Sequence, residues 1–247
     1  MRSTRLIMGM PVTIEVVGDE GGEAAHAAFA YFEDVDARFS PFKPESEVSG
    51  FARGDLPFED VSRELREVLE LSELTRRETD GYFDIRRPDG RIDPSGLVKG
   101  WAIRNAARGI EAAGHPNYFV DAGGDVQCRG HNAQGQRWRI GIRNPFDEAQ
   151  IVKVVVPGDA GVATSGTYVR GRHIYDPHMS EAVSDEVASL TVIGPDIYEA
   201  DRFATAAFAM GRHGVVFLEQ QPGLEAYSIG RDGVATMTSG FTKYVAQ

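Results

Sequence analysis

The hydrophobic pattern changes within the stretch 187–211, which reads VASLTVIGPDIYEADRFATAAFAMG. Residues 187–193 alternate and then run apolar, as a buried strand does. The residues that follow carry apolar side chains at helical spacing and stop at Gly211, a residue type that commonly ends helices. The pattern therefore predicts a strand that leads directly into a helix.

An acidic residue lies on the apolar face of this predicted helix. Asp201 and Thr205 fall on the stripe of Ile197 and Phe208, because positions three and four apart stack on one face. A carboxylate and a hydroxyl one turn apart are hard oxygen ligands of the kind that Mg²⁺ accepts. A buried acid is also common as a hydrogen-bonded core residue or as an ion-pair partner, here in the neighbourhood of Arg202. The helix pattern alone leaves these interpretations open.

Helical patterns dominate the first half of the chain and strand patterns dominate the middle. We expect helices at 21–39, 46–52, 62–79 and 95–113, the last with Ser95 as its N-cap. We expect short strands at 1–18, 118–123, 125–130, 137–142, 151–156, 161–166 and 172–177, and a final strand pair within 224–244. Early helices, a central antiparallel β meander and a further βα unit predict an α+β fold of two intimately joined lobes, with 1–247 as a single domain.

Composition excludes several classes of protein. The 247 residues are 42% hydrophobic and 26% charged, and no run of 18 apolar residues could span a membrane. Acidic residues outnumber basic ones by 37 to 26, which argues against nucleic acid as a partner. The single cysteine, Cys128, excludes an internal disulfide and is expected in a strand as a small hydrophobic residue. The first residues lack the pattern of a secretory signal, so we expect a cytoplasmic protein.

Three glycine-bearing turns, at 93–96, 121–125 and 163–166, could present bare backbone amides to a ligand. The pair Gly123-Gly124 is also typical of a simple hairpin turn. Lys99 lies in the first turn of the helix expected at 95–113, where the helix dipole disfavours a cation. It is therefore either a phosphate contact or an ordinary surface lysine.

Taken in order, eight short motifs resemble those of the ApbE-like FAD:protein FMN transferases. They are MGMPVTIEV, FS at 39–40, DPSGLVKGWA, VDAGGDV, WRIGIRNP, VATSGTYVR, HIYDP and TVIGP…EADRFATAAFAMG, and they span 8–211. The resemblance implies an enzyme that moves the FMN half of FAD onto a threonine hydroxyl of a partner flavoprotein and releases AMP. FAD would be the substrate and Mg²⁺ the cofactor.

The resemblance also implies roles for particular residues. The Mg²⁺ ligands would be Asp201, Thr205 and the backbone carbonyl of Gly96. His173 of HIYDP would assist the acceptor hydroxyl, as a general base or by positioning, so that His173 and Asp201 are the expected catalytic residues. The flavin pocket would be formed by Met8, Gly9, Phe83, Asp84, Asp93, Lys99, Gly123, Gly124, Ser165, Gly166 and Tyr175.

The sequence departs from the family pattern in three places. Only Ile85 and RRPDGRI lie between Phe83-Asp84 and Asp93, where most members have a longer loop. His-Met-Ser-Glu follows Pro177 in place of the usual Thr-Gly, and Ala204 stands where some members have a second acid. Two other functions therefore stay open, a Mg²⁺-dependent FAD pyrophosphatase that yields FMN and AMP, and a non-catalytic FAD-binding or delivery protein. Oxygen ligands also leave the choice between Mg²⁺ and Mn²⁺ open.

Overall fold

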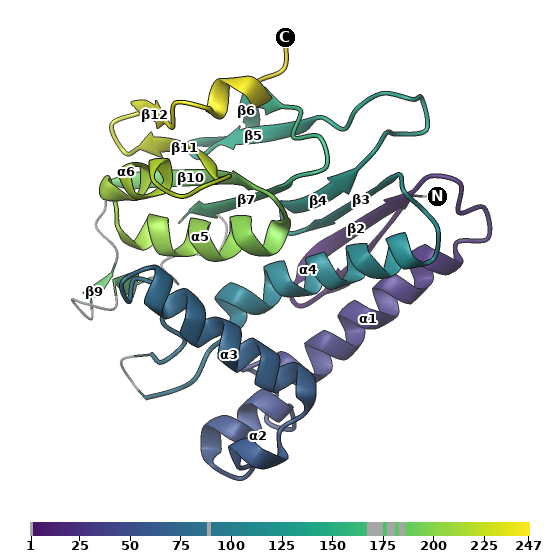
Figure 1. Cartoon of the computed structure of the whole chain (residues 1–247), viewed down its shortest axis with the longest axis vertical. Coiled ribbons are helices and arrows are strands. Elements are labelled where there is room, and N and C mark those ends of the chain that lie inside the picture. Colours follow the sequence, from purple (N-terminus) through teal and green to yellow (C-terminus); the bar gives the residue numbers. More distant parts are fainter. Residues whose placement is uncertain (1, 88–89, 167–174, 177–180, 183–185) are drawn as a thin grey trace.

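A large antiparallel sheet is the centre of the fold (Figure 1). The computed structural model describes residues 2–87, 90–166, 175–176, 181–182 and 186–247. Within these residues eight strands form the sheet in the order β1-β2-β3-β4-β7-β10-β11-β12. Their bounds are β1 (Arg2–Ile7), β2 (Met10–Val16), β3 (Tyr118–Ala122), β4 (Asp125–Arg129), β7 (Gly161–Gly166), β10 (Val187–Gly194), β11 (Glu225–Gly230) and β12 (Ala235–Met237).

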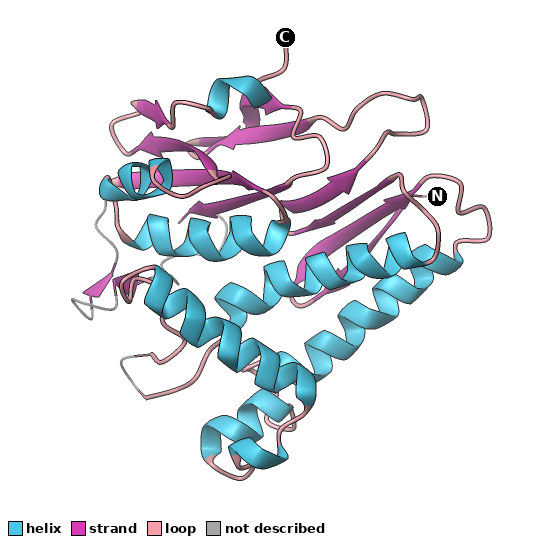
Figure 2. Ribbon diagram, in the orientation of Figure 1, coloured by secondary structure: helices cyan, strands magenta, loops and turns pink. Residues whose placement is uncertain are grey.

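Helices cover one face of this sheet, as Figure 2 shows. They are α1 (Glu23–Phe39), α4 (Ser95–Ala112), α5 (Ile197–Ala209) and α6 (His213–Glu219). Two further helices pack against this layer rather than against the sheet: α2 (Glu47–Arg53) against α1, and α3 (Arg63–Glu78) against α4. There are 3₁₀ turns at Phe58–Asp60 and Phe241–Tyr244. A ribbon of β5 (Ile140–Asn144) and β6 (Asp147–Val155) packs on the opposite face. The expected α+β class is thus confirmed.

Local sequence signals set where several helices begin. Ser46 Oγ accepts a hydrogen bond from the amide of Ser49, and Ser62 Oγ accepts one from Leu65. Asp196 caps α5 in the same way, through the amide of Glu199. Because the first amides of a helix have no partner within it, these side chains stabilise the helix starts that the patterns predicted.

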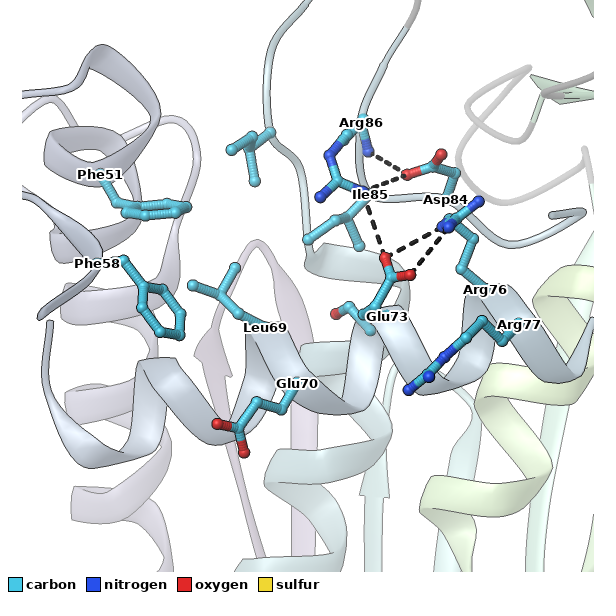
Figure 3. A pocket seen from close by; sticks show the side chains of 12 residues that line it. Phe51, Phe58, Leu69, Glu70, Glu73, Arg76, Arg77, Asp84, Ile85 and Arg86 are labelled. Carbon is cyan, nitrogen blue, oxygen red and sulfur yellow. Dashed lines mark hydrogen bonds and ion pairs between the residues drawn. The ribbon is translucent and has the colours of Figure 1, made fainter.

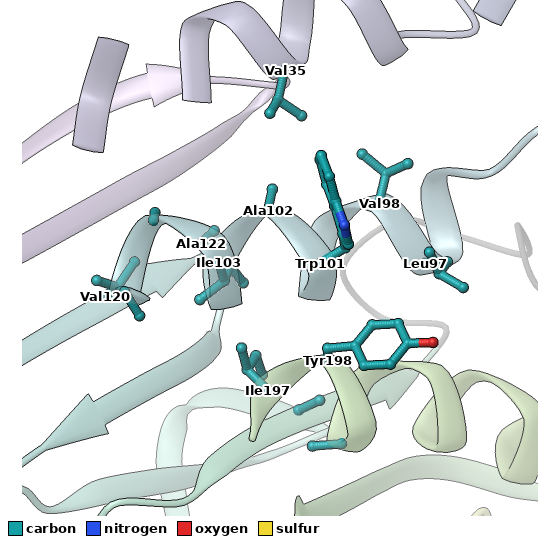
Figure 4. Close-up of a cluster of buried hydrophobic side chains, with 14 of the residues drawn as sticks. Val35, Leu97, Val98, Trp101, Ala102, Ile103, Val120, Ala122, Ile197 and Tyr198 are labelled. Carbon is teal, nitrogen blue, oxygen red and sulfur yellow. The ribbon is translucent and has the colours of Figure 1, made fainter. Parts of the chain in front are cut away.

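The hydrophobic core lies on both faces of the sheet. Between α1, α4 and α5 it contains Trp101, Ile197 and Tyr198, all nearly inaccessible (Figure 4). On the other face, Cys128 and Trp138 pack in a second cluster beneath the β5–β6 ribbon. Cys128 is fully buried in β4, which confirms its expected place as a small hydrophobic residue in a strand.

Several expectations about strands were wrong. The segment expected as one strand at 1–18 is the hairpin β1–β2, turned at Met8 (φ 55°) and Gly9 (φ 70°). The meander is interrupted, because β5 and β6 leave the main sheet and β4 pairs with β7 instead. Hydrophobic alternation marks these segments as strands but does not specify which neighbour each one joins.

The ends of some elements also differ. Pro94, not Ser95, precedes α4 as its N-cap residue. The strand pair expected within 224–244 is confirmed as β11–β12, but a 3₁₀ turn follows it and the helix α6 that precedes it was not expected. Of the strand expected at 172–177, only β8 (Tyr175–Asp176) is described, paired with β9 (Glu181–Ala182).

Candidate functional site

Two helices that are distant in sequence cross in close contact at the centre of the molecule. A Cβ atom added to Gly100 of α4 would lie 2.7 Å from Asp201 Cβ and 3.0 Å from the carbonyl oxygen of Ile197 in α5. Only glycine fits at this distance, because any other residue would push the helices apart. The crossing places the first turn of α4 directly against Asp201.

Asp201 is buried at this crossing, as its place on the apolar stripe predicted. The residue is 2% exposed; its Oδ2 accepts a hydrogen bond from the Gly100 amide at 2.9 Å, and its Oδ1 lies 3.2 Å from Lys99 Nζ. The neighbouring Arg202 turns away to Glu78 and Glu199. Of the alternatives for Asp201, an ion pair in the Arg202 neighbourhood is therefore not what the structure shows.

Lys99 connects Asp201 to a second buried acid, Asp125. Lys99 Nζ forms an ion pair with Asp125 Oδ2, and the lysine side chain is only 17% exposed. Asp125 begins β4, is 2% exposed, and accepts a hydrogen bond from the amide of Thr164 in β7 at 2.9 Å. Lys99 is therefore not a solvated surface lysine. Its ammonium tolerates the first turn of α4 because it pairs with the carboxylates of Asp125 and Asp201.

Burial and charge act in opposite directions on Asp201. Removal from water raises the pKa of its carboxyl group, the Lys99 ammonium opposes that rise, and the Asp125 charge adds to it. Two acids share one lysine here, so the ionised cluster of these three side chains carries one negative charge. Such a cluster favours a further cation.

Gly96 and Thr205 lie beside this cluster. A Cβ atom added to Gly96 would lie 4.0 Å from Thr205 Oγ1 and 3.4 Å from Phe83 Cε2, so backbone, hydroxyl and ring meet at the start of α4. The Gly100 amide, which in a regular helix faces the carbonyl of Gly96, lies within hydrogen-bond distance of Asp201 Oδ2. The Gly96 carbonyl, which has two lone pairs, retains capacity to accept another partner.

These donors fit a hard cation. In the described residues no group of three or more His, Cys, Asp or Glu side chains could hold a metal ion. A carboxylate, a hydroxyl and a backbone carbonyl are nevertheless the oxygen types that Mg²⁺ takes, and Mg²⁺ usually keeps several waters or substrate phosphate oxygens. The Asp201 carboxylate, the Thr205 hydroxyl and the Gly96 carbonyl would provide such oxygen ligands and leave the remaining positions to water or phosphate.

The glycine turns converge on the same end of the sheet. Because β2 and β3 are antiparallel, the Met8-Gly9 turn lies beside Gly123-Gly124, and the Gly123 amide donates to the Pro11 carbonyl at 3.0 Å. Gly123-Gly124 is indeed a hairpin turn, with φ of 65° and 98°. Ser165-Gly166 ends β7 at this edge, directly after Thr164. Backbone from three motifs thus lies at the end of the sheet where Asp125 begins β4.

Asp93 anchors the loop before α4. Its Oδ1 accepts hydrogen bonds from the amide and the hydroxyl of Ser95, at 3.1 and 2.6 Å, and its Oδ2 pairs with Arg87 at 3.0 Å. This explains why Ser95 is not the cap that the sequence indicated: its side chain is a donor to Asp93. The contacts fix the position of Gly96.

A cavity of about 350 Å³ lies beside α3 (Figure 3). Asp84 lines it, while the preceding residue Phe83 faces Gly96. Glu73 binds Arg76 and Arg86 at the cavity wall. The apolar part of the cavity wall comprises Phe51, Phe58, Leu69, Ile85 and Ile92. The sequence did not predict this cavity, since the residues that form it come from four separate segments.

Two residues that the sequence did not single out hold α5 in place. Gln127 Oε1 accepts a hydrogen bond from the Ile197 amide at 2.9 Å, while its Nε2 donates to the Asp159 carbonyl. Gly161 of β7 lies so close that a Cβ atom there would be 2.1 Å from the Ile197 nitrogen. Asp125 was likewise missed as a site residue, although an acid that opens a buried strand directly after a Gly-Gly turn is a recognisable signal.

Two expected site residues cannot be placed. His173 lies outside the described residues, and Tyr175 is described only as part of the backbone of β8. Their assigned roles stay predictions from the HIYDP motif.

Comparison with known proteins agrees with this arrangement. The family model described as the ApbE family matches residues 8–87 and 86–228, and so covers most of the chain. The chain belongs to the ApbE family. The two matched segments overlap at 86–87, within the loop that the sequence predicts to be shorter than in most members.

Curated relatives of this ApbE-family chain are named FAD:protein FMN transferase. An FAD:protein FMN transferase of Vibrio cholerae is 35% identical over 133 residues, which are 50% of this chain and 40% of that protein. One from Haemophilus influenzae is 24% identical over 283 aligned positions, covering 88% of this chain and 82% of that protein. The first of these matches, like others to curated relatives, spans less than half the length of the relative.

Solved structures support the fold. The flavin transferase ApbE from Vibrio cholerae superimposes with a TM-score of 0.87 at 24% identity, covering 99% of this chain and 98% of that chain. In the residues described here, no helix is long and apolar enough to cross a membrane.

Proposed function

We propose that this ApbE chain, acting as one domain over 1–247, transfers the FMN moiety of FAD to a threonine hydroxyl of a partner flavoprotein and releases AMP in a Mg²⁺-dependent reaction. The observation that carries the proposal is the buried cluster of Asp201, Lys99 and Asp125 next to Gly96 and Thr205. Family membership and the names of the relatives support the same reaction.

Asp201, Thr205 and the Gly96 carbonyl would hold the Mg²⁺ ion. When bound, the ion offsets negative charge on the pyrophosphate and makes AMP a better leaving group. The burial of Asp201 supports this role, because a carboxylate kept from water interacts more strongly with a cation than an exposed one does.

The chain's own groups would orient the two substrates. The threonine oxygen forms a bond to the phosphorus of the FMN half, the bond from that phosphorus to the bridging oxygen breaks, and AMP leaves with that oxygen. The hydroxyl proton must go to a base, for which the HIYDP motif supplies His173. In phosphoryl transfer most catalysis comes from positioning and electrostatics, which a rigid helix crossing can provide.

The flavin would lie against the glycine turns at the end of the sheet. Met8, Gly9, Gly123, Gly124, Ser165 and Gly166 would supply backbone contacts, and Phe83, Asp84, Asp93, Lys99 and Tyr175 would supply side chains. The convergence of the three turns on one edge supports this pocket. The cytoplasmic location stays a prediction from the sequence.

Product analysis tests the proposal. The chain is incubated with FAD, Mg²⁺ and a threonine-bearing flavoprotein, and the acceptor is examined by intact mass spectrometry while nucleotides are separated by chromatography. We expect AMP release that depends on the acceptor and an acceptor heavier by one FMN group, located on threonine. Free FMN with AMP in the absence of acceptor would instead indicate a pyrophosphatase, and unchanged FAD would indicate a binding protein.

A further inference from the structure

Asp125 contacts Lys99 rather than any of the three groups assigned to the metal. It projects from the start of β4, and its carboxylate is fixed from both sides: Oδ1 by the Thr164 amide and Oδ2 by the Lys99 ammonium. Thr164 is itself held, because its hydroxyl lies 2.9 Å from that of Thr191 in β10. The sheet therefore sets the position of Asp125 independently of α4 and α5.

Lys99 has two acids within reach and can favour either one. Its ammonium contacts Asp125 Oδ2 and lies 3.2 Å from Asp201 Oδ1. If Asp125 carried no charge, the ammonium would pair with the charged carboxylate of Asp201, because a buried cation requires a counterion. Asp201 would then be neutralised by the lysine, and a divalent cation would have to compete with that ion pair.

We propose that Asp125 is a positioning residue that holds the Lys99 ammonium and thereby leaves the Asp201 carboxylate available to a divalent cation. This inference rests on the metal site of the proposed function but assigns a residue outside its ligand set. It follows that loss of the Asp125 charge weakens metal binding even though Asp125 does not contact the metal. It also follows that the effect depends on Lys99.

The test measures binding of Mn²⁺ alone to the full chain, by the electron paramagnetic resonance signal of the free ion. Asp125→Asn keeps an oxygen for the Thr164 amide and removes only the charge. We expect its Mn²⁺ dissociation constant to rise at least about tenfold, the scale expected for one charge lost near a partly buried cation. Circular dichroism and the melting temperature in EDTA establish that the variant is folded.

A second variant tests the dependence on Lys99. In Lys99→Met/Asp125→Asn no ammonium is left to compete for Asp201, so we expect the Mn²⁺ dissociation constant to return to within about threefold of the parent value. A purely structural role of Asp125 would not be rescued by a second substitution in the same cluster. A double variant that binds as weakly as Asp125→Asn would therefore overturn the inference.

Asp121 provides the matched control. It lies in the same hairpin but on the opposite face of the sheet, because it pairs with Val126 while Asp125 pairs with Ala122. Its carboxylate accepts a hydrogen bond from the Gly124 amide at 2.8 Å. We expect Asp121→Asn to bind Mn²⁺ about as the parent does. If the parent and Asp125→Asn bind Mn²⁺ equally, the role proposed for Asp125 is wrong but the metal site can stand. If the parent binds no Mn²⁺, the proposed metal site is wrong as well.

Discussion

At the scale of single residues, the groups that contact the Asp201 carboxylate determine whether it can bind a cation. Its inward direction could be predicted from the sequence, because Ile197 and Phe208 mark the apolar stripe of the same helix. Its partners could not be predicted, since Lys99 comes from another helix and Asp125 from a strand, and only tertiary packing brings them together. The same acid beside Arg202 alone would have been an ordinary structural ion pair.

Replacement of Asp201 by Asn should not destabilise the metal-free protein. The amide can still accept from the Gly100 N–H, Lys99 keeps Asp125 as its counterion, and one buried negative charge is removed. We expect a melting temperature in EDTA that is unchanged or a few degrees higher, since about 1 kcal/mol shifts a domain of this size by roughly 2–4 °C. A large fall measured by calorimetry would show that Asp201 is mainly a structural residue.

The Cys128 thiol should be unreactive in the folded protein. Burial raises its pKa to about 12, and its Sγ lies 3.4 Å from the Gly158 carbonyl oxygen. Because the thiolate is the reactive form and almost none exists at about pH 8, a thiol reagent should modify the native chain far more slowly than the unfolded chain. The rate of Cys128 modification can be measured from the colour released by a disulfide reagent, in the presence and absence of guanidinium. Equal rates in the two conditions would show that β4 opens readily.

At the scale of elements, long amphipathic segments were predictable and pairing was not. The 62–79 pattern became α3, with Leu65 and Val68 fully buried, and 187–193 became β10, in which every residue is buried. Helix α6 was missed because its apolar residues are consecutive rather than periodic, and Val216 among them is 60% exposed. The departure of β5 and β6 from the sheet likewise has no signal in their alternation.

The contact between β7 and the start of α5 should tolerate no side chain at Gly161. A methyl group there would lie 2.1 Å from the Ile197 nitrogen, and backbone cannot yield as a flexible side chain can. We expect Gly161→Ala to lower the free energy of unfolding by about 3 kcal/mol or more.

Gly109 of α4 is the control for Gly161. It is exposed, and a Cβ atom added to it meets nothing within 4 Å. Gly109→Ala should therefore stabilise the helix by about 0.5–1 kcal/mol. Urea denaturation of both variants gives the comparison, and a Gly161→Ala variant as stable as the parent would contradict the close packing described for α5.

At the scale of the whole molecule, the fold gathers scattered motifs at one end of a sheet. The turns at 8–9, 123–124 and 165–166 meet there because β2, β3, β4 and β7 are adjacent and antiparallel. The order of the motifs indicated the family, and the topology explains why segments so far apart in sequence can form a single site. The cavity beside α3 and the ion pair between Asp125 and Lys99 became visible only from the packed structure.

The measurement that tests the central claim most directly is the rate of acceptor modification by the parent and by Asp201→Asn, followed by intact mass spectrometry with FAD and Mg²⁺ present. As the only carboxylate among the proposed metal ligands, Asp201 would provide the charge that holds the ion against the pyrophosphate. We predict that the parent adds one FMN group to the acceptor and that the variant, folded to the same extent, is at least about 100-fold slower. Transfer by Asp201→Asn at the parent rate, still dependent on Mg²⁺, would contradict the account.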